Sequence, residues 1–223
     1  MTIKLFLSAI AKFALGVVLL GALLFWPAGT LNYPQGWLLM GILFIPMFLA
    51  GLVMMAKNPD LLRSRLNAKE KRGEQSLVIK LSGLMFLTGF ILAGLSFRLG
   101  WWMLPKWVSI LGAVLFLISY ALYAEVLREN TWLSRTIEVQ EGQTVVSTGL
   151  YGIVRHPMYA ATLVLLLSMP LVLGSVWCLL VFLAYPAIIS KRLLDEERFL
   201  AEELPGYGEY MKKVKWRLVP FIW

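Results

Sequence analysis

Long apolar runs separated by shorter polar connections make up most of this chain. Four runs, at residues 5–26, 37–56, 77–97 and 107–127, each come close to the ~20 apolar residues that a helix needs to cross a bilayer. A fifth apolar block, 158–190, is too long for a single span. The pattern therefore predicts a chain built from membrane-spanning helices.

The fifth block contains its own turn signal. Its middle reads MPLVLGS at 169–175, and proline and glycine in such a stretch favour a turn. We therefore expect two helices, at 158–172 and 175–190, folded back on each other as a tight hairpin. The whole chain is then an all-α integral membrane protein with about six transmembrane helices. Five spans with one re-entrant element fit the pattern almost as well.

Composition agrees with the membrane class. Hydrophobic residues make up 59% of the chain and charged residues only 15%, against roughly a quarter charged in soluble domains. The first apolar run is longer than the apolar core of a signal peptide and lacks a small-residue cleavage pattern, so we expect a span there. The chain's one cysteine, Cys178, excludes an intramolecular disulfide and is expected to be a small buried hydrophobe.

Positive charges alternate between the connections. The connections after the second, fourth and sixth runs hold Lys57, Arg63, Arg65, Lys69, Lys71, Arg72 and Lys80, then Arg128, Arg135 and Arg155, then Lys191, Arg192, Arg198, Lys212, Lys213, Lys215 and Arg217. The other three connections hold only Arg98 and Lys106. The positive-inside rule therefore predicts that both termini and these basic connections are cytoplasmic. Topology and attraction to anionic lipid explain the charge, so no nucleic-acid partner is expected.

The chain's one histidine lies in the stretch VRHPMY, 154–159. Proline restricts the residue before it and is favoured in the first turn of a helix, so Pro157 is expected to start the fifth helix with His156 near its N-cap. Free N–H groups and the charge of Arg155 would make this a corner that favours an anionic group. The alternative is interfacial anchoring by Arg155 and Tyr159.

A carboxylate lies on an apolar helix face after the sixth run. In IISKRLLDEERFLAEEL, 188–204, helical spacing places Leu193, Glu197, Leu200 and Leu204 on one stripe. A carboxylate on such a face costs free energy unless it is paired or used, so Glu197 is a candidate site residue.

These two features predict a pocket at the cytoplasmic surface. The segment 128–156 and the C-terminal helix are expected to close it, with the cationic corner of Arg155 and His156 at one end and carboxylates at the other. Such a pocket suits a ligand that carries both a carboxylate and a cation. The acidic end is expected to include Glu196, which is also spaced to form an ordinary i,i+4 surface pair with Arg192.

These residues resemble a known family. The pattern G-x-Y-x-x-x-R-H-P-x-Y, the apolar hairpin, a pair of glutamates and the tail LPGYGEYMKKVKWRLVP are similar to the isoprenylcysteine carboxyl methyltransferase family and, more loosely, to the membrane phospholipid N-methyltransferases. The matching positions are Gly149, Tyr151, Arg155, His156, Pro157, Tyr159, Glu196, Glu197, Tyr207 and Tyr210. The resemblance covers about 125–223, and the first four runs match only in general character.

The resemblance implies a methyltransferase that uses S-adenosylmethionine and no metal. Carried over by motif, the cofactor-binding residues are Gln140, Tyr151, His156, Pro157, Tyr159, Glu196 and Glu197. Arg155 and Arg192 are candidate catalytic residues that orient or electrostatically assist the acceptor. Residues 1–127 would then be N-terminal transmembrane helices, and 128–223 the methyltransferase core.

The acceptor stays open at this point. A lipidic or prenylated carboxylate is favoured and needs no general base, whereas the amine of a phospholipid would need His156 or a glutamate to accept a proton. Outside methyl transfer, a membrane reductase of the sterol-reductase kind using a nicotinamide cofactor and a non-enzymatic transporter or scaffold are the alternatives. The sequence does not determine the oligomeric state.

Overall fold

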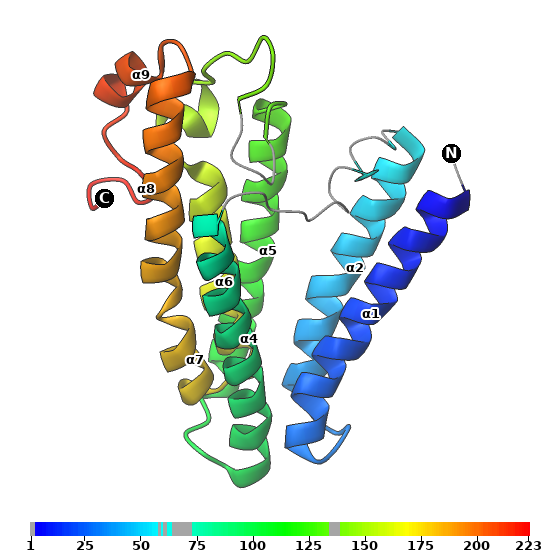
Figure 1. Ribbon diagram of the computed structural model, residues 1–223. Coiled ribbons are helices and arrows are strands. Elements are labelled where there is room, and N and C mark those ends of the chain that lie inside the picture. The colour runs from blue at the N-terminus through cyan, green and yellow to red at the C-terminus, as the bar shows by residue number, and fades with distance from the viewer. Residues whose placement is uncertain (1–2, 58, 60–61, 64–72, 134–138) are drawn as a thin grey trace.

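The computed structural model describes residues 3–57, 59, 62–63, 73–133 and 139–223. Within these ranges the chain is helical and contains no strand. The helices are α1 (Ile3–Ala28), α2 (Pro34–Lys57), α4 (Gly73–Leu99), α5 (Lys106–Glu129), the 3-10 turn η1 (Gly149–Gly152), α6 (Pro157–Leu173), α7 (Val176–Phe182), α8 (Tyr185–Glu203) and α9 (Tyr207–Lys213) (Figure 1). The basic residues Arg65, Lys69, Lys71, Arg72 and Arg135 lie outside the described residues.

Five helices are long and apolar enough to cross a membrane. They are Leu5–Ala28, Pro34–Lys57, Leu77–Leu99, Lys106–Glu129 and Val176–Glu203, the last of which joins α7 and α8. The sixth apolar helix, α6, has only 17 residues, about 26 Å of helix. The all-α membrane fold predicted from the sequence is confirmed, with five helices of spanning length and one shorter apolar helix.

The hairpin turn forms where the sequence predicts it. The helix α6 ends at Leu173, and Gly174 adopts the left-handed conformation with φ 68°, which favours glycine at a helix C-terminus. Ser175 then caps α7: its Oγ accepts from the N–H of Cys178 at 3.2 Å and donates to Ser96 Oγ at 2.9 Å. These contacts tie the turn to α4.

The helices α1 and α2 form a hairpin beside the other helices, and α1 packs against α4 (Figure 1). Their connection is anchored by Tyr33, a buried side chain whose ring stacks on Phe97 with centroids 4.2 Å apart. The Tyr33 hydroxyl donates to the carbonyl of Leu173 at 3.1 Å. Because that carbonyl lies in the last turn of α6, the tyrosine satisfies a group that the helix leaves unpaired.

The return helix, expected as a single helix over 175–190, is interrupted. The helix α7 ends at Phe182 and α8 begins at Tyr185, with Pro186 in the first turn of α8. Proline has no N–H to donate to the carbonyl four residues earlier, so the ladder breaks at this point.

The helices α5 and α6 approach closely at Gly112. A Cβ there would lie 2.7 Å from the backbone nitrogen of Val172 and 2.8 Å from Cβ of Leu171. Replacing Gly112 with valine is therefore expected to push α5 off α6 and to destabilise the protein by about 1–3 kcal/mol. Gly83→Val is the control, because a Cβ at Gly83 meets no atom of the described residues within 4 Å. Thermal unfolding in detergent measures both, and equal midpoints for the two variants would contradict the close approach.

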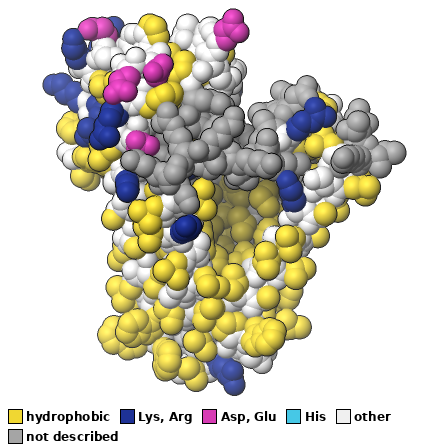
Figure 2. All heavy atoms as spheres, viewed as in Figure 1, with side chains coloured by type: hydrophobic (Ala, Val, Ile, Leu, Met, Phe, Trp, Pro, Cys, Tyr) yellow, Lys and Arg dark blue, Asp and Glu magenta, His cyan; other side chains and the backbone are white. Residues whose placement is uncertain are grey.

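Apolar and charged side chains separate along the molecule. Figure 2 shows hydrophobic side chains covering most of the length of the helices, and acidic and basic side chains gathered mainly towards the end where α9 lies. We call this the polar end: residues 139–156, α9 and the C-terminal tail, 214–223. A polar end on an apolar helical body is what a bilayer requires of a spanning protein.

Candidate functional site

The start of α6 is fixed by the C-terminal tail. Pro157 is the first residue of α6 and His156 is its N-cap residue, as the sequence predicts. The N–H of Arg155 donates to the carbonyl of Trp216 at 2.8 Å, and the N–H of His156 donates to the carbonyl of Arg217 at 3.0 Å. The RHP motif and the tail therefore form one unit at the polar end.

Glu197 is the centre of a buried ion cluster. Its side chain, on α8, belongs to a residue that is only 6% exposed. Its Oε1 accepts from Arg155 Nε at 2.6 Å and lies 3.2 Å from His156 Nε2, while its Oε2 accepts from Arg217 Nε at 2.8 Å. The cost of burying this carboxylate is thus offset by charged partners from two other segments.

This cluster corrects one expectation from the sequence. The cationic corner and Glu197 were expected at opposite ends of the pocket, but they are in direct contact. The expectation followed the rise of the two helices and left out the length of the side chains. Arg155 and Glu197 together reach across that offset, and an unpaired carboxylate on the apolar face would be unfavourable.

A second polar cluster lies one residue away on α8. The hydroxyl of Tyr159 donates a short hydrogen bond to Glu196 Oε2, and Arg192 Nε donates to the same hydroxyl at 3.1 Å. The predicted i,i+4 pair of Arg192 and Glu196 is therefore joined through Tyr159 of α6. Because a carboxylate and a guanidinium lie side by side here, this cluster can contact both signs of charge on a ligand.

On one side of the site, hydrogen bonds of tyrosines connect α9, η1 and the residue that follows α5. The hydroxyl of Tyr210, on α9, donates to the carbonyl of Tyr151 at 2.8 Å, and Asn130 Nδ2 donates to the Tyr151 hydroxyl at 2.9 Å. Burial is the largest cause that raises the pKa of Tyr151, to about 12, and burial also raises the pKa values of Tyr207 and Tyr210. These three phenols are therefore neutral throughout the physiological pH range.

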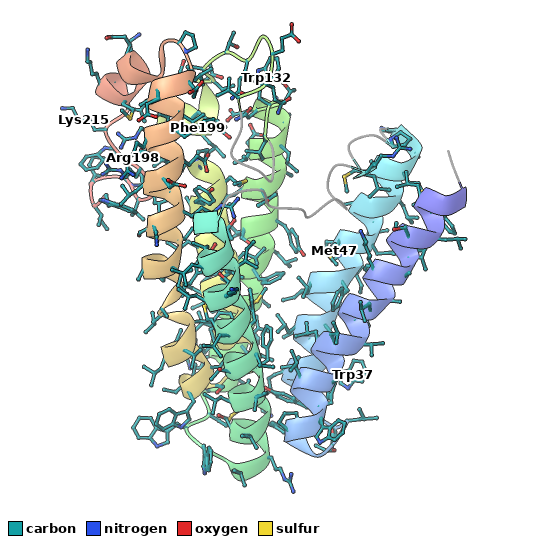
Figure 3. All side chains as sticks on the ribbon, in the orientation of Figure 1. Trp37, Met47, Trp132, Arg198, Phe199 and Lys215 are labelled. Carbon is teal, nitrogen blue, oxygen red and sulfur yellow. The ribbon has the colours of Figure 1, made fainter. Side chains whose placement is uncertain are left out.

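These segments enclose a pocket between α6, α8, α9 and the connection before η1. Its lining combines aromatic, apolar and charged side chains: Asn130, Trp132, Leu133, Gln143, Thr144, Val145, Val146, Tyr151, Arg155, His156, Met158, Tyr159, Arg192, Glu196, Leu200, Leu204, Tyr207 and Tyr210. Trp132, labelled in Figure 3, lies at the polar end near the top of the bundle. Among the described residues no group of three or more His, Cys, Asp or Glu side chains is placed to hold a metal ion.

The structure divides the predicted site residues into two sets. Those that line the pocket are Tyr151, Arg155, His156, Tyr159, Arg192 and Glu196. Gln140, Pro157 and Glu197 do not line it. Gln140 Nε2 instead donates to the carbonyl of Trp132 at 2.8 Å, and Glu197 holds the ion cluster behind the wall.

One pocket residue stands out by what it lacks. The hydroxyl of Tyr207 is buried and has no hydrogen-bond partner within the described part of the chain. A buried hydroxyl without a hydrogen-bond partner costs free energy. A pocket that contains such a hydroxyl is therefore suited to a ligand that hydrogen-bonds to it.

Sequence reasoning missed two residues that shape the site. Arg217 was read only as a topological charge, although it is a cation within the apolar stretch WRLVPFIW, a setting in which a partner is to be expected. Glu129 was not considered; its Oε2 accepts from the N–H of Leu150 at 3.0 Å and so fixes the start of η1. No sequence signal marked that contact.

Gly149 is required by the geometry of this turn. Its φ is +51°, and a Cβ there would fall 1.3 Å from Oε1 of Glu129. Gly149→Ala is therefore expected to displace Glu129 from Leu150. It should lower the free energy of unfolding by about 1–3 kcal/mol more than the backbone strain of an alanine at positive φ would alone. Gly142→Ala is the matched control, since Gly142 has φ +74° but no described atom within 4 Å of the added Cβ. Thermal unfolding compares the two variants. Equal losses of stability in Gly149→Ala and Gly142→Ala would contradict the role of Glu129.

Comparison with known proteins finds sequence similarity to one family and to individual relatives. Residues 107–206 match the model of the phospholipid methyltransferase family. The cobalt-zinc-cadmium resistance protein CzcN of Cupriavidus metallidurans is 33% identical over 129 residues, 56% of this chain and 56% of that protein. A Delta(14)-sterol reductase of Mus musculus is 31% identical over 91 residues, 40% of this chain and 22% of that protein. The matches thus span about half and about a fifth of the lengths of these two relatives.

A solved structure matches nearly the whole chain. The eukaryotic intramembrane Ras methyltransferase ICMT, an isoprenylcysteine carboxyl methyltransferase, aligns with a TM-score of 0.61 over 96% of this chain and 77% of its own, at 18% identity. The resemblance inferred from the sequence is confirmed: the chain has the fold of isoprenylcysteine carboxyl methyltransferase, and its residues 107–206 carry the pattern of the phospholipid methyltransferase family.

Proposed function

We propose that this chain is a membrane-embedded methyltransferase that uses S-adenosylmethionine and acts on a lipidic or prenylated acceptor. The fold and the family match support this class of activity. The observation that carries the proposal is the pocket itself, where charges of both signs lie beside the Tyr207 hydroxyl, which has no hydrogen-bond partner among the described residues. An amphoteric ligand with several hydrogen-bonding groups is what such a lining fits.

The residues of the pocket suit this cofactor. When bound, S-adenosylmethionine supplies a methyl group that its sulfonium has already activated. Glu196 is placed to hold the cationic groups, while Tyr207 and the N-terminal end of α6 at His156 are placed to hold polar and anionic groups. We assign supporting roles to the three predicted residues outside the lining: Glu197 holds Arg155 and His156, Pro157 starts α6, and Gln140 fixes the carbonyl of Trp132.

We propose that the acceptor binds on the side of the pocket where Arg192 lies. A carboxylate acceptor is already ionised, so the protein has only to position it, and positioning accounts for much of the rate in such reactions. Arg192 lines the pocket and can orient a carboxylate. Arg155 also lines the pocket, but its guanidinium is bonded to Glu197 and to two carbonyls of the segment 214–215, so we assign it an electrostatic role without direct contact to the acceptor. In this proposal the catalytic core is 128–223, and the basic connections place the pocket on the cytoplasmic side.

A phospholipid amine is the second candidate acceptor. The description of the matched family favours it. An amine must lose a proton on methylation, and His156 and Glu196 are the pocket residues able to accept one. Isoprenylcysteine-like carboxylates remain our first candidate because Arg192 brings a guanidinium to that side of the pocket.

Two tyrosines provide the test. We expect saturable calorimetric binding of S-adenosylmethionine and of its demethylated product to the detergent-purified protein. Tyr207→Phe should weaken that binding about fivefold, the value of one hydrogen bond, and should not lower thermal stability, because no partner within the described residues is lost. Tyr210→Phe is the matched control; it should lower thermal stability, because its hydroxyl pairs with Tyr151.

Two outcomes would overturn the proposal. Binding of NADPH in place of S-adenosylmethionine would point to the activity named for the sterol-reductase relative. Equal affinity of the wild type and Tyr207→Phe would remove the residue from the cofactor site.

A further inference from the structure

The C-terminal tail, 214–223, packs behind the wall of the site, against Arg155, His156 and Glu197. Besides the backbone bonds from Arg155 and His156, it receives the Arg155 guanidinium, whose Nη1 donates to the carbonyls of Val214 at 3.0 Å and Lys215 at 3.2 Å. Arg217 of the tail donates to Glu197. A tail that moved away would therefore leave Arg155, His156 and Glu197 short of partners.

The tail is also folded on itself. The N–H groups of Arg217, Leu218 and Val219 donate to the carbonyl oxygen of Trp223 at 2.9, 2.9 and 3.1 Å. The Arg217 guanidinium lies 5.3 Å from the centroid of the Trp223 ring, a cation–π contact. Leu218 is buried against the main hydrophobic core. The tail therefore docks as a compact unit with an inner face and an outer face.

The outer face combines cations with exposed apolar side chains. Phe221 is 85% exposed and Ile222 78% exposed, and the Phe221 ring lies 5.6 Å from that of Trp216. Lys213 and Lys215 are exposed just before them in the chain. Figure 2 shows basic side chains gathered on this flank, and Figure 3 shows Lys215 and Arg198 on the outer side of α8.

The position of the tail matches a bilayer surface. Figure 1 shows it returning from α9 along the side of α8. The apolar body of the return helix ends on α8 where charged residues begin, at Lys191. Aromatic side chains next to lysines at such a boundary are typical of segments that bind the interface, and lysines there are attracted to anionic headgroups.

We propose that the segment 212–223 is a binding surface for anionic phospholipid, and that this lipid holds the tail in its docked position against the site. Phe221 and Ile222 enter the interface, and Lys213 and Lys215 contact the phosphates. A ligand that binds only the docked tail shifts the equilibrium towards it, which stabilises the contacts of Arg155, His156 and Glu197. Any effect of lipid on turnover rests on the proposed function, whereas the binding of lipid to the segment 212–223 does not.

Hydrogen exchange of the protein in nanodiscs tests whether anionic lipid holds the tail, and needs neither cofactor nor acceptor. The intact chain is compared in phosphatidylcholine alone and in phosphatidylcholine with a third phosphatidylglycerol. We expect the amides of Arg155, His156 and 217–219 to exchange at least fivefold more slowly in the anionic discs. Lys213→Gln/Lys215→Gln should abolish the difference. The control Lys57→Gln/Lys80→Gln removes the same charge from exposed positions on α2 and α4. It should keep the difference in exchange between the two discs.

Each other outcome counts against the proposal. Equal exchange in the two discs would show that anionic lipid does not hold the tail. Slower exchange in anionic discs that survives Lys213→Gln/Lys215→Gln would show that these lysines do not form the binding surface. Equal loss of the difference in both double variants would show that total charge, and not this surface, is responsible. Because exchange is measured without S-adenosylmethionine, failure of the proposed function leaves the result readable.

Discussion

Replacing Glu197 with glutamine is expected to destabilise the protein by about 3 kcal/mol and to release the C-terminal tail. The change keeps the shape of the side chain but removes the charge that Arg155, His156 and Arg217 share. Arg155 is itself 8% exposed, so its guanidinium would be left buried without a counter-charge. Thermal unfolding in detergent and hydrogen exchange of the tail amides measure the two effects.

Glu202→Gln is the control for this prediction. It removes the same charge from the same helix, but Glu202 is exposed. Its effect on stability should be within about 0.5 kcal/mol. A Glu197→Gln protein as stable as Glu202→Gln, with unchanged exchange in the tail, would show that the ion cluster does not hold the polar end together.

Replacing Arg192 with glutamine is expected to lower kcat/KM for methyl transfer about a hundredfold, the cost of losing one well-placed electrostatic contact to a reacting group. Affinity for S-adenosylmethionine should change little, because Arg192 is assigned to the acceptor. Arg192→Lys should recover part of the rate by restoring the charge without the planar donor geometry. Steady-state kinetics and calorimetric binding separate these effects.

Arg198→Gln is the matched control, because Arg198 is an exposed arginine on the same helix and points to the outside of the bundle (Figure 3). It should retain full activity. Equal losses of kcat/KM in Arg192→Gln and Arg198→Gln would contradict the role assigned to Arg192. A loss of cofactor affinity in Arg192→Gln would reassign the residue to the cofactor.

The fold was predictable because lipid imposes simple rules on sequence. Apolar runs of spanning length, a Pro–Gly turn and a proline at a helix start are local signals, and they placed α1, α2, α4, α5 and the α6 hairpin. The break between α7 and α8 has a local signal in Pro186, whereas the contact of Tyr33 with Leu173 was not predictable. That contact depends on which helices pack together, and one sequence does not carry that information in local form.

The sequence marked a buried carboxylate but not its pairing. The stripe of Leu193 and Glu197 correctly marked a buried carboxylate, since both residues are buried on α8. Its partner Arg217 lies 20 positions further along the chain, beyond another helix, so periodicity could not connect them. That the Tyr207 hydroxyl lacks a partner within the described part of the chain is visible only in three dimensions, because it depends on what surrounds the hydroxyl.

The most direct test of the account is methyl transfer itself. The purified protein in lipid is given S-adenosylmethionine with a radiolabelled methyl group and, separately, an S-prenylated N-acetylcysteine or phosphatidylethanolamine. The account predicts label in the prenylated acceptor that is released by mild base, as a methyl ester is, and that Arg192→Gln largely removes. Base-stable label in phosphatidylethanolamine would select the amine. Saturable cofactor binding with no label in either acceptor would contradict the proposed substrate class, and no binding of S-adenosylmethionine would contradict the proposed function.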